Sequence, residues 1–157
     1  MDKKILEVSK LICRKLKNHD VKWVYSGSTS LALQGIDVHP TDIDITTDRD
    51  GAYSINEILK SYEVKPIEFG IKGSFRSYFG NLIINDIKID ILGDFSLKVG
   101  KKWINVSNPR LKAIKTVKIG NYEMPVTPLE NHLEIYKAMN RDKDKEKIRK
   151  IEQALGR

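Results

Sequence analysis

The segment Asp42-Ile-Asp-Ile-Thr-Thr47 constrains the fold more than any other part of the chain. Polar and apolar residues alternate along it, which is the period of two typical of a β-strand. Asp42 and Asp44 therefore lie on one face of the strand and the isoleucines on the other. Two carboxylates side by side repel each other, and removing them from water is costly unless a cation or a proton compensates. We therefore expect a core strand with one apolar face and one face that carries an acidic site.

The segments around this strand predict a chain of mixed α and β structure. Apolar residues at helical spacing indicate helices, and β-prone or alternating runs indicate strands. The expected helices span residues 3–17, 29–34, 51–61, 129–139 and 143–155. The expected strands span residues 22–26, 42–47, 63–69, 75–84 and 86–92, with a further pair within 110–127. The predicted fold class is α/β of the α+β type, a mixed β-sheet flanked by helices.

Length and composition limit the classes of protein that this chain can belong to. Its 157 residues fit a single domain over 1–157, with a C-terminal helical segment at about 128–157. No apolar run approaches the length of a membrane span and no signal peptide is recognisable, so we expect a cytoplasmic protein without a membrane partner. A single cysteine excludes an intramolecular disulfide. The formal net charge of +7 favours anionic partners.

Three Asp-x-Asp pairs occur in the sequence, and two of them have ordinary structural explanations. The pairs that begin at Asp48 and Asp142 stand at expected helix starts, where capping and the helix dipole favour acids. The pair Asp42-Ile-Asp44 lies in a strand instead. Its structural explanation is an exposed edge strand, on which charges deter aggregation. Its functional explanation is a magnesium site, because Mg²⁺ prefers carboxylate oxygens together with substrate phosphates.

Two further features favour the magnesium site. Asp90 stands between two isoleucines in the strand expected at 86–92, and would complete a carboxylate set for one or two magnesium ions. Gly27-Ser28 follows a strand and opens a helix, where backbone N–H groups bind anions. We therefore expect Gly27 and Ser28 to bind a triphosphate while the paired aspartates bind the metal that bridges its phosphates.

In this order, Gly27-Ser28, a spacer of thirteen residues, Asp42-Ile-Asp44 and a later Asp90 resemble the signature of the nucleotidyltransferase superfamily with the DNA polymerase β-like fold. The form SLALQG…HPTDIDI is similar to the stand-alone branch that includes AbiEii-type toxins and antibiotic nucleotidyltransferases. The C-terminal pattern that contains Lys137 and Arg141 resembles a helical segment of AbiEii-like members. That resemblance implies that both basic residues contact nucleotide phosphates.

The resemblance implies a Mg²⁺-dependent transferase that moves a nucleoside monophosphate from a nucleoside triphosphate to an acceptor hydroxyl and releases pyrophosphate. Asp42 and Asp44 would bind the metal on the triphosphate. Asp90 would help to bind a second ion and deprotonate the acceptor hydroxyl. The acceptor stays open between a small molecule such as an antibiotic, a protein side chain and the 3′ end of an RNA. A homodimer would be one way to complete an acceptor site.

Two alternative functions remain open at this point. One is a non-catalytic nucleotide-binding or nucleic-acid-binding module of the same fold, and the other is the toxin component of a toxin–antitoxin pair. Among the remaining polar residues, Lys88 is expected to form a salt bridge with Asp90, and Arg76 is a weaker candidate for phosphate binding. The three histidines are expected to be structural or surface residues.

Overall fold

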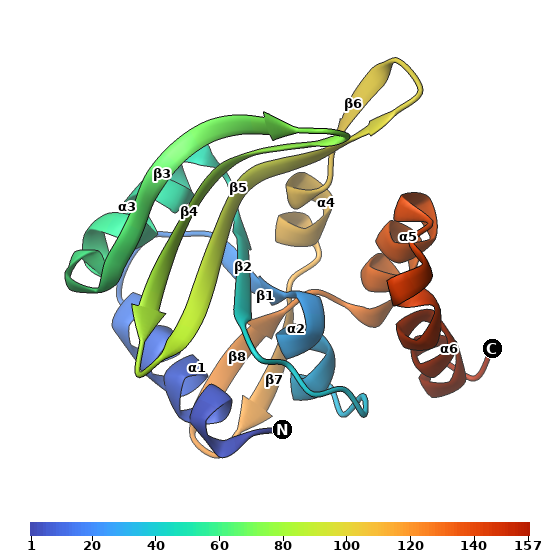
Figure 1. Ribbon diagram of the computed structural model, residues 1–157. Helices are drawn as coiled ribbons and strands as arrows, with labels where there is room; N and C mark the ends of the chain where they lie inside the picture. Colours follow the sequence, from blue (N-terminus) through green and yellow to red (C-terminus); the bar gives the residue numbers. More distant parts are fainter.

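The computed structural model describes residues 1–157 as a mixed β-sheet with helices on both faces (Figure 1). The helices are α1 (Lys3–Leu16), α2 (Gly27–Leu33), α3 (Arg49–Ile58), α4 (Ser107–Lys112), α5 (Leu129–Met139) and α6 (Lys145–Ala154). The strands are β1 (Trp23–Ser26), β2 (Ile43–Thr47), β3 (Glu63–Lys72), β4 (Phe75–Ile84), β5 (Ile87–Val99), β6 (Lys102–Asn105), β7 (Lys115–Ile119) and β8 (Tyr122–Val126). None of the helices is long and apolar enough to cross a membrane.

The strands form a sheet in the order β3-β4-β5-β2-β1-β8-β7, and β6 pairs with the end of β5. Strands β2 and β5 are parallel, and so are β1 and β8, whereas the remaining pairs are antiparallel. This arrangement confirms the predicted fold class. It also places β2 and β5, which carry the predicted acidic residues, next to each other near the middle of the sheet.

The apolar face of the central strands packs against α1 and α3. Ile43 and Ile45 are fully buried in the main core, where they join Ile12 of α1 and Ile55 of α3. Because side chains alternate along a strand, Asp44 must point to the opposite face. The core thus fixes the direction of the carboxylate, as the sequence pattern predicts.

A second, smaller core attaches the C-terminal helices α5 and α6 to α2. It consists of Leu31, Ile36, Leu133, Tyr136 and Ile151. The two C-terminal helices lie beside α2 and stand opposite α4 and the β5–β6 hairpin (Figure 1). They therefore face the polar side of the sheet without belonging to the main core.

Several element boundaries differ from the sequence prediction. The strand pair expected within 110–127 is shorter, because α4 includes the residues up to Lys112, and Asn105 Oδ1 accepts a hydrogen bond from the Asn108 N–H in its first turn. Strand β5 continues well past the expected end at residue 92 and forms a hairpin with β6. Helix α3 begins at Arg49, because Asp48 caps it through the Gly51 N–H.

Candidate active site

Three neighbouring strands bring together two of the three predicted acidic residues, Asp44 and Asp90. In the antiparallel pair of β1 and β2, Ser26 lies opposite Asp44, and in the parallel pair of β2 and β5, Asp44 lies opposite Asp90. The two aspartates are therefore on adjacent strands, on the same face and at the same height. Both line one cavity, and neither has a fully exposed side chain.

Gly27 follows β1 directly and lies against the Asp44 carboxylate. Its φ angle of +60° is in the left-handed region, and a Cβ added to it would overlap Asp44 Oδ2. A side chain at this position would displace the carboxylate as well as strain the backbone. Ser28 lines the cavity beside it. Gly27, Ser28, Asp44 and Asp90, all expected from the sequence, thus line one cavity.

Asp42 lies at the edge of this site and not inside the cavity. Its side chain is 47% exposed, and Lys88 Nζ stands between it and Asp90, 3.7 Å from a carboxylate oxygen of each. The predicted ion pair between Lys88 and Asp90 is confirmed. With Lys88 in this position, no three acidic, histidine or cysteine side chains form a ready cluster for a metal ion.

The charged forms of Asp44 and Asp90 are destabilised by their surroundings in the site. Burial, followed by the nearby charges of Asp90 and Asp42, raises the pKa of Asp44 to about 6. Burial also raises the pKa of Asp90, although Lys88 partly opposes this effect. Asp90 Oδ1 is buried without a hydrogen-bond partner. A cation between Asp44 and Asp90 would relieve the repulsion and give this oxygen a partner.

The cavity has a volume of about 780 Å³ and lies between the sheet and the C-terminal helices. The central strands, the Gly-Ser turn and α4 provide its floor, strands β3 and β4 one wall, and α5 with the segment after it the other. Seven basic residues line it, against three acidic ones. The basic residues are Lys65, Lys72, Arg76, Arg110, Arg141, Lys143 and Lys147. This excess of positive charge suits a polyanionic ligand such as a triphosphate.

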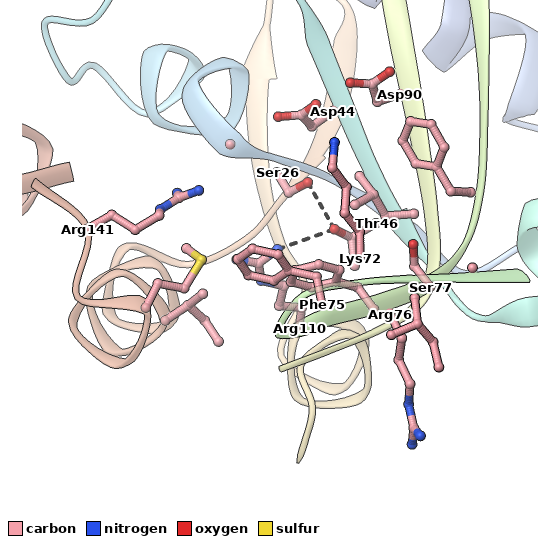
Figure 2. Close-up of a pocket in the computed structure, with 18 of the residues that line it drawn as sticks. Ser26, Asp44, Thr46, Lys72, Phe75, Arg76, Ser77, Asp90, Arg110 and Arg141 are labelled. Atoms are coloured by element: carbon pink, nitrogen blue, oxygen red, sulfur yellow. Dashed lines mark hydrogen bonds between the residues drawn. The ribbon is translucent and has the colours of Figure 1, made fainter. Parts of the chain in front are cut away.

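Arg110 of α4 is a site residue that sequence reasoning did not single out. It is 7% exposed, and its guanidinium donates one hydrogen bond to Thr46 Oγ1, whose hydroxyl in turn contacts Ser26 Oγ (Figure 2). No carboxylate pairs with it, and its Nε is buried without a partner. Burial lowers the pKa of Arg110 to about 10, so that it remains charged at neutral pH. The structure thus holds a buried, unpaired cation below the carboxylates.

The structure separates the two basic residues of the C-terminal pattern. Helix α5 ends at Met139, and Asn140 adopts a left-handed conformation. Arg141 lines the cavity, where its Nε donates a hydrogen bond to the fully buried carboxylate of Asp144 at 2.6 Å. Lys137 does not line the cavity and instead pairs with Glu152 on α6. Of the two, only Arg141 is placed to meet a ligand in the cavity.

The remaining candidate residues, Arg76 and the three histidines, do not point toward the carboxylates of the cavity. Arg76 lines the cavity wall, but its guanidinium lies over the ring of Trp103 and points away from Asp44 (Figure 2). His132 is buried against Ser30 Oγ at 2.9 Å, and burial lowers its pKa well below the usual value. His19 and His39 are exposed. None of the histidines lines the cavity.

Comparisons with known proteins agree with this geometry. The sequence profile of the aminoglycoside-2''-adenylyltransferase family matches residues 8–151. A candidate nucleotidyltransferase from Thermotoga maritima is 34% identical in sequence and superposes with a TM-score of 0.85, over 100% of this chain and 97% of that one. A search of curated proteins found no match.

The fold is also shared with a more distant enzyme. The crystal structure of ANT(2'')-Ia in complex with adenylyl-2''-tobramycin superposes with a TM-score of 0.61 at 12% identity, over 99% of this chain and 91% of that one. A solution structure of ANT(2'')-Ia gives a TM-score of 0.60 at 14% identity, over 99% of this chain and 86% of that one. At this level of identity the similarity concerns the fold alone.

Proposed function

The chain belongs to the aminoglycoside-2''-adenylyltransferase family and is a nucleotidyltransferase, and on this premise we propose that it transfers a nucleoside monophosphate to an acceptor hydroxyl at the site around Asp44 and Asp90. The reaction forms a bond between the acceptor oxygen and the α-phosphorus, and breaks the bond to the leaving pyrophosphate. The observation that carries the proposal is the register of β2 and β5, which aligns two partly buried carboxylates beside the Gly27 turn.

The residues fit a magnesium ion, which would neutralise the triphosphate and polarise the reacting phosphate when bound. Asp44 and Asp90 offer carboxylate oxygens, the donors that this ion prefers, and one of those oxygens is buried without any partner. Asp42 would join them once Lys88 moves from its position between Asp42 and Asp90. Mg²⁺ dependence is therefore part of the proposal, with Asp44 and Asp90 as the principal ligands.

The other residues of the cavity are proposed to position the nucleotide. Gly27 and Ser28 would let the triphosphate come close to the backbone. Gly27 has no side chain that would separate the phosphates from the Asp44 carboxylate. Arg110 and Arg141 supply positive charge from the floor and from the helical wall. Because Arg110 is unpaired, a bound phosphate would give it the partner that the protein does not provide.

Asp90 is proposed to accept the proton of the acceptor hydroxyl. Its strand is followed in the sheet by β4 and β3, so that the carboxylate stands between the Gly-Ser turn and the strand wall of the cavity. Burial raises its pKa, which makes it a stronger base than an ordinary aspartate. The acceptor would then lie on the side of the cavity formed by β3 and β4.

The test is transfer of label from α-labelled nucleoside triphosphates to components of a cell extract, with Mg²⁺ or with a chelator. The variants are Asp44→Asn and Asp90→Asn, and the matched control is Asp86→Asn, at the exposed turn before β5. We expect Mg²⁺-dependent transfer that both site variants lose and the control retains. Transfer that survives in Asp44→Asn, or calorimetry that detects no Mg²⁺-dependent nucleotide binding, would contradict the proposal.

A further inference from the structure

The segment 95–122 has an unusual charge distribution, of which the proposed reaction uses only Arg110. It contains seven basic residues and no acidic one, which equals the net charge of +7 of the whole chain. Lys98, Lys101 and Lys102 of this segment are exposed on the β5–β6 hairpin. None of these three lysines takes part in an ion pair. The hairpin therefore presents positive charge that the protein itself does not neutralise.

This positive surface is continuous with the strand wall of the cavity. Arg76 lines the cavity and lies over the Trp103 ring at 4.6 Å, while Lys98 lies over the same ring at 5.9 Å. We call Lys72, Arg76, Lys98, Lys101, Lys102 and Trp103 the basic track. Lys72 extends into the cavity (Figure 2), and the β5–β6 hairpin, which carries the other lysines, projects from the end of β5 (Figure 1).

Aromatic side chains accompany the cations in the cavity. Phe75 and Phe95 line it and stack on each other with ring centroids 5.8 Å apart. Phe69, also in the lining, is 47% exposed. Alternating basic and aromatic side chains bind single-stranded nucleic acid, because the cations meet the phosphates and the rings meet the bases.

The same wall is unsuited to a polycationic amino sugar. Its single acidic residue is Glu68, beside Lys65, Lys72 and Arg76. The other acids of the cavity, Asp44 and Asp90, are those that the proposed reaction needs for the metal. Placing further positive charge against the track would be repulsive.

We propose that the acceptor is the 3′-terminal hydroxyl of a single-stranded nucleic acid, with the terminal nucleotide in the cavity and the preceding phosphates on the basic track. The inference rests on the proposed function, because it names the acceptor of the same reaction. The terminal oxygen attacks the α-phosphorus, its proton passes to Asp90, and pyrophosphate leaves. The product is a chain longer by one nucleotide.

The experiment offers single-stranded RNA and DNA oligonucleotides to the full-length protein with Mg²⁺ and labelled nucleoside triphosphates. Oligonucleotides with a blocked 3′ end and tobramycin are the comparison acceptors. We expect label on one or both oligonucleotides with a free 3′ hydroxyl, and none on the blocked ones. Label on tobramycin or on a small molecule of the extract, with none on either oligonucleotide, would overturn the inference and leave the proposed function intact.

Binding is measured separately, by fluorescence anisotropy of the same oligonucleotides at increasing salt. The variant Lys98→Glu/Lys101→Glu/Lys102→Glu is compared with Lys3→Glu/Lys15→Glu/Lys17→Glu, which makes the same change in net charge on α1 and its C-cap residue. We expect about tenfold weaker binding and a shallower salt dependence for the hairpin variant only. Absence of salt-sensitive binding, or equal losses in both variants, would overturn the inference whatever the transfer assay gives. If Mg²⁺-dependent nucleotide binding is also absent, the proposed function fails with it.

Discussion

Gly27 has to be a glycine for two independent reasons, its backbone conformation and its contact with Asp44. Gly35 is a matched control, because it also has a positive φ angle, +86°, but nothing lies within 4 Å of an added Cβ. We expect Gly27→Ala and Gly35→Ala each to lower the free energy of unfolding by about 1–2 kcal/mol through backbone strain. Only Gly27→Ala should lose nucleotide transfer. Urea unfolding and the transfer assay measure the two effects, and equal losses of transfer would contradict this account of Gly27.

Asp44 makes the metal-free protein less stable as the pH rises. Its pKa is about 6 when folded against an ordinary 3.8, so the folded state binds the proton more tightly than the unfolded state does. Its contribution is therefore most favourable below about pH 4 and is lost as the pH rises through about 6. Through Asp44, the free energy of unfolding at neutral pH is lower than at acidic pH by on the order of 3 kcal/mol.

Asp44→Asn should consequently stabilise the metal-free protein at neutral pH and have little effect near about pH 4. Urea unfolding in the presence of a chelator, at both pH values, measures this difference. Asp86→Asn serves as the control, since the Asp86 side chain is 92% exposed. A variant that is equally or less stable than the native protein at neutral pH would show that Asp44 is not strained in this way.

At the scale of elements, the strands near the site could be predicted from the sequence, and the place of α4 in its floor could not. The alternation in 42–47 predicts the direction of Asp44, because the period of a strand is a local property. The tight connection between the strands expected at 75–84 and 86–92 is also a local property, and Asn85 and Asp86 there have the positive φ angles of hairpin turns. Arg110 contacts Thr46 across 64 positions of sequence, a contact that depends on the path of the whole chain.

Helix α4 matters for the site because it places Arg110 beneath the carboxylates. Arg110→Met retains a long side chain but removes the charge. We expect the Arg110→Met variant to be at least as stable as the native protein, since a buried unpaired guanidinium is unfavourable. Nucleotide affinity with Mg²⁺ should fall by about 10- to 100-fold, the range for hydrogen bonds to charged groups.

Calorimetry gives the affinity and urea unfolding gives the stability of this variant. Lys112→Met is the control on the same helix, because Lys112 is exposed. Unchanged nucleotide affinity in Arg110→Met would show that the arginine serves the fold alone. A parallel loss of affinity in Lys112→Met would instead indicate a general effect of charge.

At the scale of the whole molecule, the cavity joins two separately packed parts. The main core holds the strands that carry the carboxylates, and the second core holds α5 and α6, whose side chains form the opposite wall. Ile151 and Ile55 are both fully buried, one in each core. Truncating either of them removes the same atoms from a different half of the molecule.

We expect Ile55→Ala and Ile151→Ala each to lower the free energy of unfolding by about 2–5 kcal/mol. Ile151→Ala should in addition weaken nucleotide binding, because it loosens the helical wall that presents Tyr136 and Arg141 to the cavity. The affinity is measured at a temperature at which circular dichroism shows both variants to be folded. Hydrogen exchange should then show faster opening of α5 and α6 in Ile151→Ala only. Equal affinities in the two folded variants would mean that the nucleotide is held by the sheet side of the cavity alone.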